Sequence, residues 1–355
     1  MRLSSSCFVA TTGLISALLA PFLSAQPVQQ PAPASSPVIK EPVAPADNYT
    51  PPQTMRDERL QPKPQPGKPD TAPLAHVETR GKGPLTMILI PGHGCDWSIW
   101  DDFMTRNADR YTMLAVTLPG FAGTDAPAVK PGSTFADLAW LDNAEWAVVQ
   151  LLDERKIEKP VIVGQGLGGL LALRIGAHHP DRPGAVIDIH GYPAFPFPGA
   201  KMPVETKPQR AAFISATGGK MYETMSDGAF DFEVQHFAQG VTMDKERAKG
   251  ILAMLRKAPR PVYTRYFFEY LAEDLTGEVS AIKAPILMVV ASEVSRAIDL
   301  PQSNEMEWRP LMAGAPKAHW AFINRSLEMV MIDQPKQTDD AIDGFLKTVL
   351  SGDKK

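Results

Sequence analysis

The residues best placed to do chemistry lie in one short string, 160–169, which reads PVIVGQGLGG. Its β-branched start predicts a strand, and the apolar stretch that follows predicts a helix. A tight turn between a strand and a helix can be a nucleophile elbow, G-x-S-x-G, in which Gly166 here takes the place of the serine. It can also be the phosphate-binding turn G-x-G-x-x-G of dinucleotide sites, which Gly164, Gly166 and Gly169 satisfy.

The dinucleotide alternative has one further feature in its favour. Asp188 lies close to the spacing at which such sites place an acidic residue for the ribose. Against it, the fingerprint normally opens the first strand–helix unit, whereas several such units precede residue 160 here. Glycine also recurs in tight turns for steric reasons alone. Dinucleotide binding through Gly164, Gly166 and Gly169 is therefore kept as an alternative.

The chain has 355 residues, of which 44% are hydrophobic, enough to bury a substantial core. Residues 1–25 combine Arg2, an apolar stretch and small residues, which predicts a secretory signal peptide. The Pro-rich segment 26–71 has too few large apolar groups to fold and predicts a disordered tether. The folded domain is expected over 72–350, in a protein that is exported to the periplasm or secreted.

Charge and cysteine content exclude several classes of partner and bond. The net charge is −4 without a basic block, so nucleic acid is not expected as a partner. Cys95 is the only cysteine after the signal region, which rules out an intramolecular disulfide in the mature chain. No stretch of the mature chain is long and apolar enough for a transmembrane segment. No histidine or cysteine spacing indicates a metal site, and no cofactor is expected.

Strands and helices alternate along the folded part. Continuous apolar runs predict buried parallel strands at Thr86–Ile90, Tyr111–Leu118, Val161–Val163, Ala185–His190, Pro285–Ala291 and His319–Asn324. Helical periodicity predicts helices at about Ser98–Arg110, Phe135–Leu152, Leu167–His179 and Thr338–Leu350. This order predicts an α/β doubly wound, mostly parallel sheet. The interval of about 192–283 shows helical patterns and no strand, which predicts a helical cap over the edge where such sheets bind ligands.

An ordered set of motifs resembles the α/β-hydrolase superfamily, of the AB hydrolase-1 type, over about residues 72–350. The string ILIPGHGCDWSIW at 88–100 resembles the oxyanion loop after that fold's third strand, and LPGFAGTD at 118–125 resembles the turn after its fourth. The elbow follows. The string RYF from Arg265, IKAPILMV at 282–289 and MIDQP at 331–335 resemble the end of the cap, the seventh strand and the final helix. The resemblance implies the α/β-hydrolase fold with a helical cap after the sixth strand.

The same resemblance implies a degenerate catalytic triad. Gly166 occupies the nucleophile position, Val294 the position of the acid, and Glu328 that of the histidine five residues before the Asp-Gln-Pro turn. Serine hydrolysis needs all three side chains, so it is not expected. His319, followed by a tryptophan, is the rival candidate for the base, but the same residue is needed to begin the last strand.

Backbone donors need no particular side chain, so an oxyanion hole can outlast the triad. The N–H of Leu167 and one near Gly94 or Cys95 are expected to point at one spot, although the glycines of this loop also suit its turn. The residues expected to bind a ligand are His93, Gly94, Cys95, Gln165, Leu167 and His190.

These observations favour an exported α/β-hydrolase-fold pseudoenzyme that binds a small carbonyl or carboxylate ligand, or a protein, in the old active-site cleft. The N-myc downstream-regulated family, whose elbow also lacks the serine, is similar in this respect. The alternative is an active hydrolase or lyase that acts on an ester-like small molecule with Glu328 as base. That chemistry requires burial to raise the pKa of Glu328.

Overall fold

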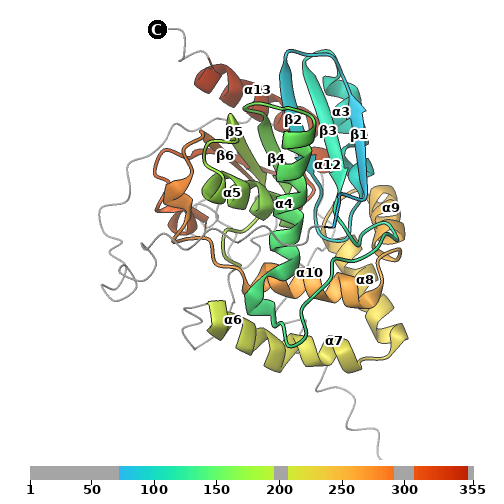
Figure 1. Ribbon diagram of the computed structural model, residues 1–355. Coiled ribbons are helices and arrows are strands. Elements are labelled where there is room, and N and C mark those ends of the chain that lie inside the picture. The colour runs from blue at the N-terminus through green and yellow to red at the C-terminus, as the bar shows by residue number, and fades with distance from the viewer. Residues whose placement is uncertain (1–71, 196–206, 292–307, 351–355) are drawn as a thin grey trace, which may run out of the picture.

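The computed structural model describes residues 72–195, 207–291 and 308–350 (Figure 1). The expected signal peptide, the expected tether and Val294 lie outside the described residues. Within the described ranges, no helix is long and apolar enough to cross a membrane.

A mostly parallel sheet forms the centre of the described structure, as predicted. Its seven strands are β1 (His76–Arg80), β2 (Leu85–Ile90), β3 (Tyr111–Thr117), β4 (Val161–Gln165), β5 (Ala185–Ile189), β6 (Ile286–Ala291) and β7 (His319–Ile323). They lie in the order β1-β3-β2-β4-β5-β6-β7. Only β1 runs antiparallel to its neighbour, β3. Strands β4, β5 and β6 are buried along their whole length, which is why their sequences are mostly apolar, with Gln165 and Asp188 as the polar exceptions.

The edge strand β1 is the element that the apolar pattern misses. Its sequence HVETR contains three charged or titratable residues, and none of its five side chains is fully buried. An edge strand packs on one neighbour only, so it needs no continuous apolar run.

Helices cover both faces of the sheet. The sheet helices are α3 (Asp101–Asn107), α4 (Ala139–Glu154), α5 (Leu167–His178), α12 (Val330–Asp333) and α13 (Pro335–Leu350). Figure 1 shows α4 and α5 in front of the sheet, with α3 and α13 on its far side. Helices α3 and α13 are joined by an ion pair between Arg106 and Asp339, with an N–O distance of 3.0 Å. The first two predicted helices begin as short 3-10 turns, at Trp97–Trp100 and Phe135–Asp137.

The described part of the interval between β5 and β6 is helical, as expected. It contains α6 (Lys207–Ile214), α7 (Lys220–Thr224), α8 (Asp227–Gly240), α9 (Lys245–Leu255) and α10 (Arg260–Ala272), with a π-helical turn at Ser215–Gly219. We call α6 to α10 the cap helices. They gather at the lower end of the molecule in Figure 1.

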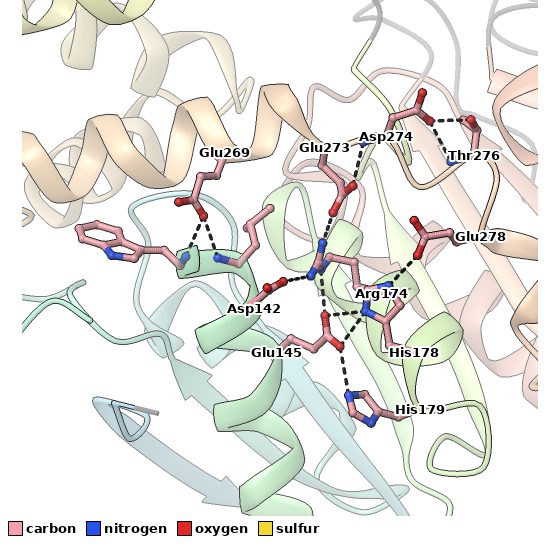
Figure 2. A network of polar contacts seen from close by, with 12 residues as sticks. Asp142, Glu145, Arg174, His178, His179, Glu269, Glu273, Asp274, Thr276 and Glu278 are labelled. Carbon is pink, nitrogen blue, oxygen red and sulfur yellow. Dashed lines mark hydrogen bonds and ion pairs between the residues drawn. The ribbon is translucent and has the colours of Figure 1, made fainter. Parts of the chain in front are cut away.

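A buried charge network ties α10 to the sheet helices (Figure 2). Arg174, on α5, is almost fully buried and binds Glu145 of α4 at 2.9 Å, together with Asp142 and Glu273. Glu273 directly follows the last residue of α10. His178 lies between Glu145 and Glu278, 2.9 Å from each. A buried guanidinium needs such partners, because transferring an unpaired charge from water to the protein interior costs several kcal/mol.

A second contact of α10 caps α4. The residue before α4, Leu138, has a φ of 50° and no capping side chain. Glu269 takes over this role, since its Oε2 accepts hydrogen bonds from the N–H groups of Trp140 and Leu141 at 2.8 and 3.0 Å (Figure 2). A carboxylate at a helix N-terminus satisfies free donors and complements the helix dipole.

Candidate active site

The turn at Gly166 has the backbone of a nucleophile elbow without the nucleophile. Strand β4 ends at Gln165 and α5 begins at Leu167, while Gly166 between them has a φ of 54° and a ψ of −118°. Its N–H donates to the Ile189 carbonyl at 2.9 Å. A Cβ added at Gly166 would find a single atom within 4 Å, the Gly92 Cα at 4.0 Å. The conformation therefore favours glycine, but the space does not demand it.

The neighbouring glycines, in contrast, are required by packing. A Cβ on Gly164 would overlap the carbonyl of Gly168, and one on Gly169 would overlap the carboxyl of Asp188. Asp188 is fully buried, and its Oδ1 accepts a hydrogen bond from the Gly191 N–H. A carboxyl in this position cannot receive a ribose hydroxyl. The glycine pattern is thus explained by close approach of α5 to the sheet, and the dinucleotide alternative loses its acidic residue.

The loop after β2 differs from the expectation at two residues. The Cys95 N–H donates to the Gly92 carbonyl at 3.1 Å, so it closes the turn and is not free for a ligand. The Cys95 thiol is buried, and burial raises its pKa, which keeps it protonated. Gly94 has a φ of 70° and faces Leu255 of α9. Neither Gly94 nor Cys95 lines the cavity described next, contrary to the ligand-binding role predicted for them.

A small cavity lies between the carboxyl ends of β4 and β5 and the helices α8 and α10. About 30 Å³ of it is open to water-sized molecules, so it holds a small group of atoms in the structure as it stands. The cavity is lined by His93, Gln165, Gly166, Leu167, His190, Tyr192, Phe195, Phe237, Phe267, Tyr270, Glu328 and Met329. Four of the six residues predicted to bind a ligand are in this set, together with Gly166 and Glu328, which align in sequence with the nucleophile and the histidine.

The aromatic part of the lining was not predicted. Phe237 comes from α8, and Phe267 and Tyr270 come from α10. The spacing of three residues between Phe267 and Tyr270 places them on one side of a helix. That spacing is the only local signal, because the sequence does not say which side of a cap helix faces the sheet.

Glu328 reaches the cavity from the loop between β7 and α12. Hydrogen bonds fix the residues on both sides of it: the Leu327 N–H donates to Oδ2 of Asp333, and the Met329 N–H donates to the Val241 carbonyl, both at 2.8 Å. Burial raises the pKa of the Glu328 carboxyl to about 8. A base at this position was expected to need a pKa raised by burial, and Glu328 has one.

Gln165 bridges the elbow and the Glu328 loop. Its Nε2 lies 3.4 Å from the Glu328 carbonyl oxygen, a long hydrogen bond, and its buried Oε1 has no hydrogen-bond partner among the described residues. A Cβ at Gly92 would overlap this Oε1. Gly92 is therefore needed to accommodate the amide of Gln165.

Two neutral histidines also line the cavity. Burial lowers the pKa of both His93 and His190 to about 3. Both ring nitrogens of His93 lack a hydrogen-bond partner among the described residues, and its ring packs against Tyr263 at a centroid distance of 4.3 Å. His190 accepts a hydrogen bond on Nδ1 from the Ala291 N–H at 3.1 Å.

The backbone N–H groups of Leu167 and His93 are the donors to consider for an oxyanion hole. The Leu167 N–H is in the first turn of α5, where no helical carbonyl can accept from it. In the described structure, the backbone hydrogen bonds outside helices and strands include none from the His93 N–H. Both residues line the cavity.

His319 begins β7, and the strand interpretation of this residue is confirmed. It pairs with Leu287, and its ring faces Phe345 of α13 at a centroid distance of 5.3 Å. The cavity lies at the other end of the parallel strands, so His319 is not among its lining residues.

Comparisons with known proteins agree with this fold. The sequence profile of the alpha/beta hydrolase family matches residues 87–341. A pimeloyl-[acyl-carrier protein] methyl ester esterase of Aeromonas hydrophila is 28% identical over 280 residues, 76% of this chain and 98% of the relative.

Solved structures share the fold. MenH from S. aureus matches with a TM-score of 0.60 at 15% identity, covering 78% of this chain and 100% of that one. The enol-lactonase from Burkholderia xenovorans matches with a TM-score of 0.56 at 18% identity, covering 76% and 95%. The family profile spans well over half of the sequence, so the chain is a member of the alpha/beta hydrolase family.

Proposed function

We propose that this protein is a hydrolase or lyase of small ester-like substrates that uses Glu328 as a general base in place of a serine nucleophile. The observation that carries the proposal is the Glu328 carboxyl in the cavity beside the empty elbow, with its pKa raised to about 8. A base works best when its pKa is near the working pH, and burial brings Glu328 into that range.

For an ester, the proposed reaction is direct attack by water. The Glu328 carboxylate accepts a proton as the water oxygen bonds to the carbonyl carbon. The N–H groups of Leu167 and His93 stabilise the resulting oxyanion. The bond to the alkoxy oxygen then breaks, and Glu328 returns its proton to the leaving alcohol. The products are an alcohol and a carboxylic acid, which loses its own proton to solvent.

The relatives support an ester-type substrate. The Aeromonas hydrophila relative is named a methyl ester esterase, and the enol-lactonase acts, by its name, on a cyclic ester. The small, largely aromatic cavity favours a compact apolar substrate.

A second candidate is a pseudoenzyme that only binds a small ligand or a protein in the same cleft. It is favoured by Gly166, which supplies no side chain at the nucleophile position.

Export of the protein to the periplasm or outside the cell is also proposed, on residues 1–25 alone, and cell fractionation tests it.

The experiment is hydrolysis of a panel of short-chain aryl esters by the purified full chain and by Glu328→Gln. Glu78→Gln, on the edge strand β1, is the matched control, because it removes a carboxyl far from the cavity. Turnover that is lost in Glu328→Gln and kept in Glu78→Gln supports the base. Absence of turnover in all three proteins favours the binding-only candidate, and turnover that survives Glu328→Gln excludes Glu328 as the base.

A further inference from the structure

The hydrogen bond from the Ala291 N–H fixes the tautomer of His190. Because Nδ1 accepts this bond at 3.1 Å, it carries no proton, and the proton of the neutral ring must lie on Nε2. That Nε2 is buried and has no hydrogen-bond partner in the described part of the chain. The Nε2–H of His190 is therefore a donor of defined direction without an acceptor among the described residues, and the side chain lines the cavity.

The position of His190 is held at a cost in backbone strain. It has a φ of 55°, a left-handed conformation that is uncommon for a residue with a Cβ. The ring packs against Trp308 and Tyr192, at centroid distances of 5.0 and 5.7 Å, and these two rings stack on each other. Strain that is kept in place by its surroundings tends to occur at functional positions.

The charge of the lining limits what the donor can bind. None of the described lining residues is a lysine or arginine, and burial keeps His93 and His190 uncharged. A carboxylate that entered would lose its hydration without meeting a cation, which is strongly unfavourable. An uncharged carbonyl group loses far less hydration free energy and can accept a hydrogen bond from Nε2–H of His190.

We infer that Nε2–H of His190 binds an oxygen of an uncharged ester, lactone or ketone, and that the cavity selects such ligands against carboxylates. For ligands that are turned over, this rests on the proposed function. An ester would then enter readily, and its acid product would be rejected, so product inhibition would be weak.

The test uses the full chain with ¹⁵N-labelled histidine, titrated by NMR with γ-butyrolactone, methyl acetate and acetate. The His190 Nε2–H resonance is expected to move on addition of the lactone or the ester. Acetate is expected to bind at least about tenfold more weakly, because its charge loses hydration in a cavity without a cation. A resonance that does not move, or acetate binding as tight as that of methyl acetate, overturns the inference.

Variants separate the donor from the shape of the site. His190→Phe keeps an aromatic ring without a donor, and is expected to weaken lactone binding about tenfold. His190→Asn keeps a donor and tolerates the left-handed backbone, so it is expected to lose less. His76→Gln, on the exposed strand β1, is the control and should bind as the wild type does. If His190→Phe does not fold, the wild-type resonance and His190→Asn decide.

The inference and the proposed function fail in different ways. Lactone binding that moves the His190 resonance, without turnover of any ester, refutes the catalytic proposal and leaves the inference standing. Turnover that depends on Glu328 while KM is unchanged in His190→Phe refutes the inference and leaves the catalytic proposal standing.

Discussion

The pH dependence of ester turnover follows from the burial of Glu328. Its carboxyl must be ionised to accept a proton, and its pKa is about 8. The ionised fraction is then about 1% at pH 6 and about 90% at pH 9, so kcat/KM is expected to rise about ninety-fold between these values and to level off above pH 9. An ordinary exposed glutamate would already be ionised at pH 6 and would give a flat profile.

The assay follows release of the alcohol from a short-chain aryl ester between pH 5.5 and 9.5. Spontaneous hydrolysis also rises with pH but does not level off, so buffer blanks and Glu328→Gln define the background. Glu78→Gln is expected to reproduce the wild-type profile. The reasoning is refuted by a wild-type profile that is flat above pH 6, or by a Glu328→Gln variant with the same plateau as the wild type.

Three further predictions concern stability and are measured by urea unfolding. Gly166→Ser is expected to fold with a loss of about 1–3 kcal/mol, because residues with a Cβ rarely adopt its φ of 54° with a ψ of −118°, while the space around Gly166 is open; a loss above about 4 kcal/mol would contradict this. Arg174→Met is expected to cost about 3–5 kcal/mol, because buried carboxylates lose their cation, whereas Arg182→Met breaks an exposed pair and should cost less than about 1 kcal/mol. Gly168→Ala is expected to cost at least about 1–3 kcal/mol, because its Cβ would overlap the carbonyl at the end of β2. Gly250→Ala lies in open space on a helix and should stabilise the protein by about 0.5–1 kcal/mol. Equal effects of the two variants would refute this packing argument.

The sheet could be predicted because its strands carry their own signal. Buried parallel strands need apolar residues on both faces, so β4 and β6 stand out as continuous runs. Strand β1 lacks this signal because only its pairing with β3 makes it a strand. The expected start of the first helix, at Ser98, falls inside a 3-10 turn that Asp96 caps through the Ser98 N–H.

The site could be predicted only where local motifs position a residue. Gly166 follows from the strand–turn–helix pattern, and Glu328 from its distance to the Asp-Gln-Pro turn. Cys95 was misjudged because the direction of a backbone N–H depends on how a turn closes, which glycine content does not reveal. Phe237 and Tyr270 depend on how α8 and α10 are rotated against the sheet, and only tertiary packing decides this.

The carboxylate of Asp333 connects two parts of the molecule that a moving lid would have to separate. Its Oδ1 accepts hydrogen bonds from the Thr242 hydroxyl and the Met243 N–H, in the turn between α8 and α9. Its Oδ2 accepts the Leu327 N–H, next to the proposed base. With α10 held by Arg174 through Glu273, the cap is fastened at two distant places.

We therefore expect substrate exchange through side-chain motion at the rim, without a hinged opening. We expect amide hydrogens of α10 and of the turn after α8 to exchange as slowly as those of β4, and to stay slow when a lactone is added. Exchange in these segments that is far faster than in the sheet would show that the cap does swing open.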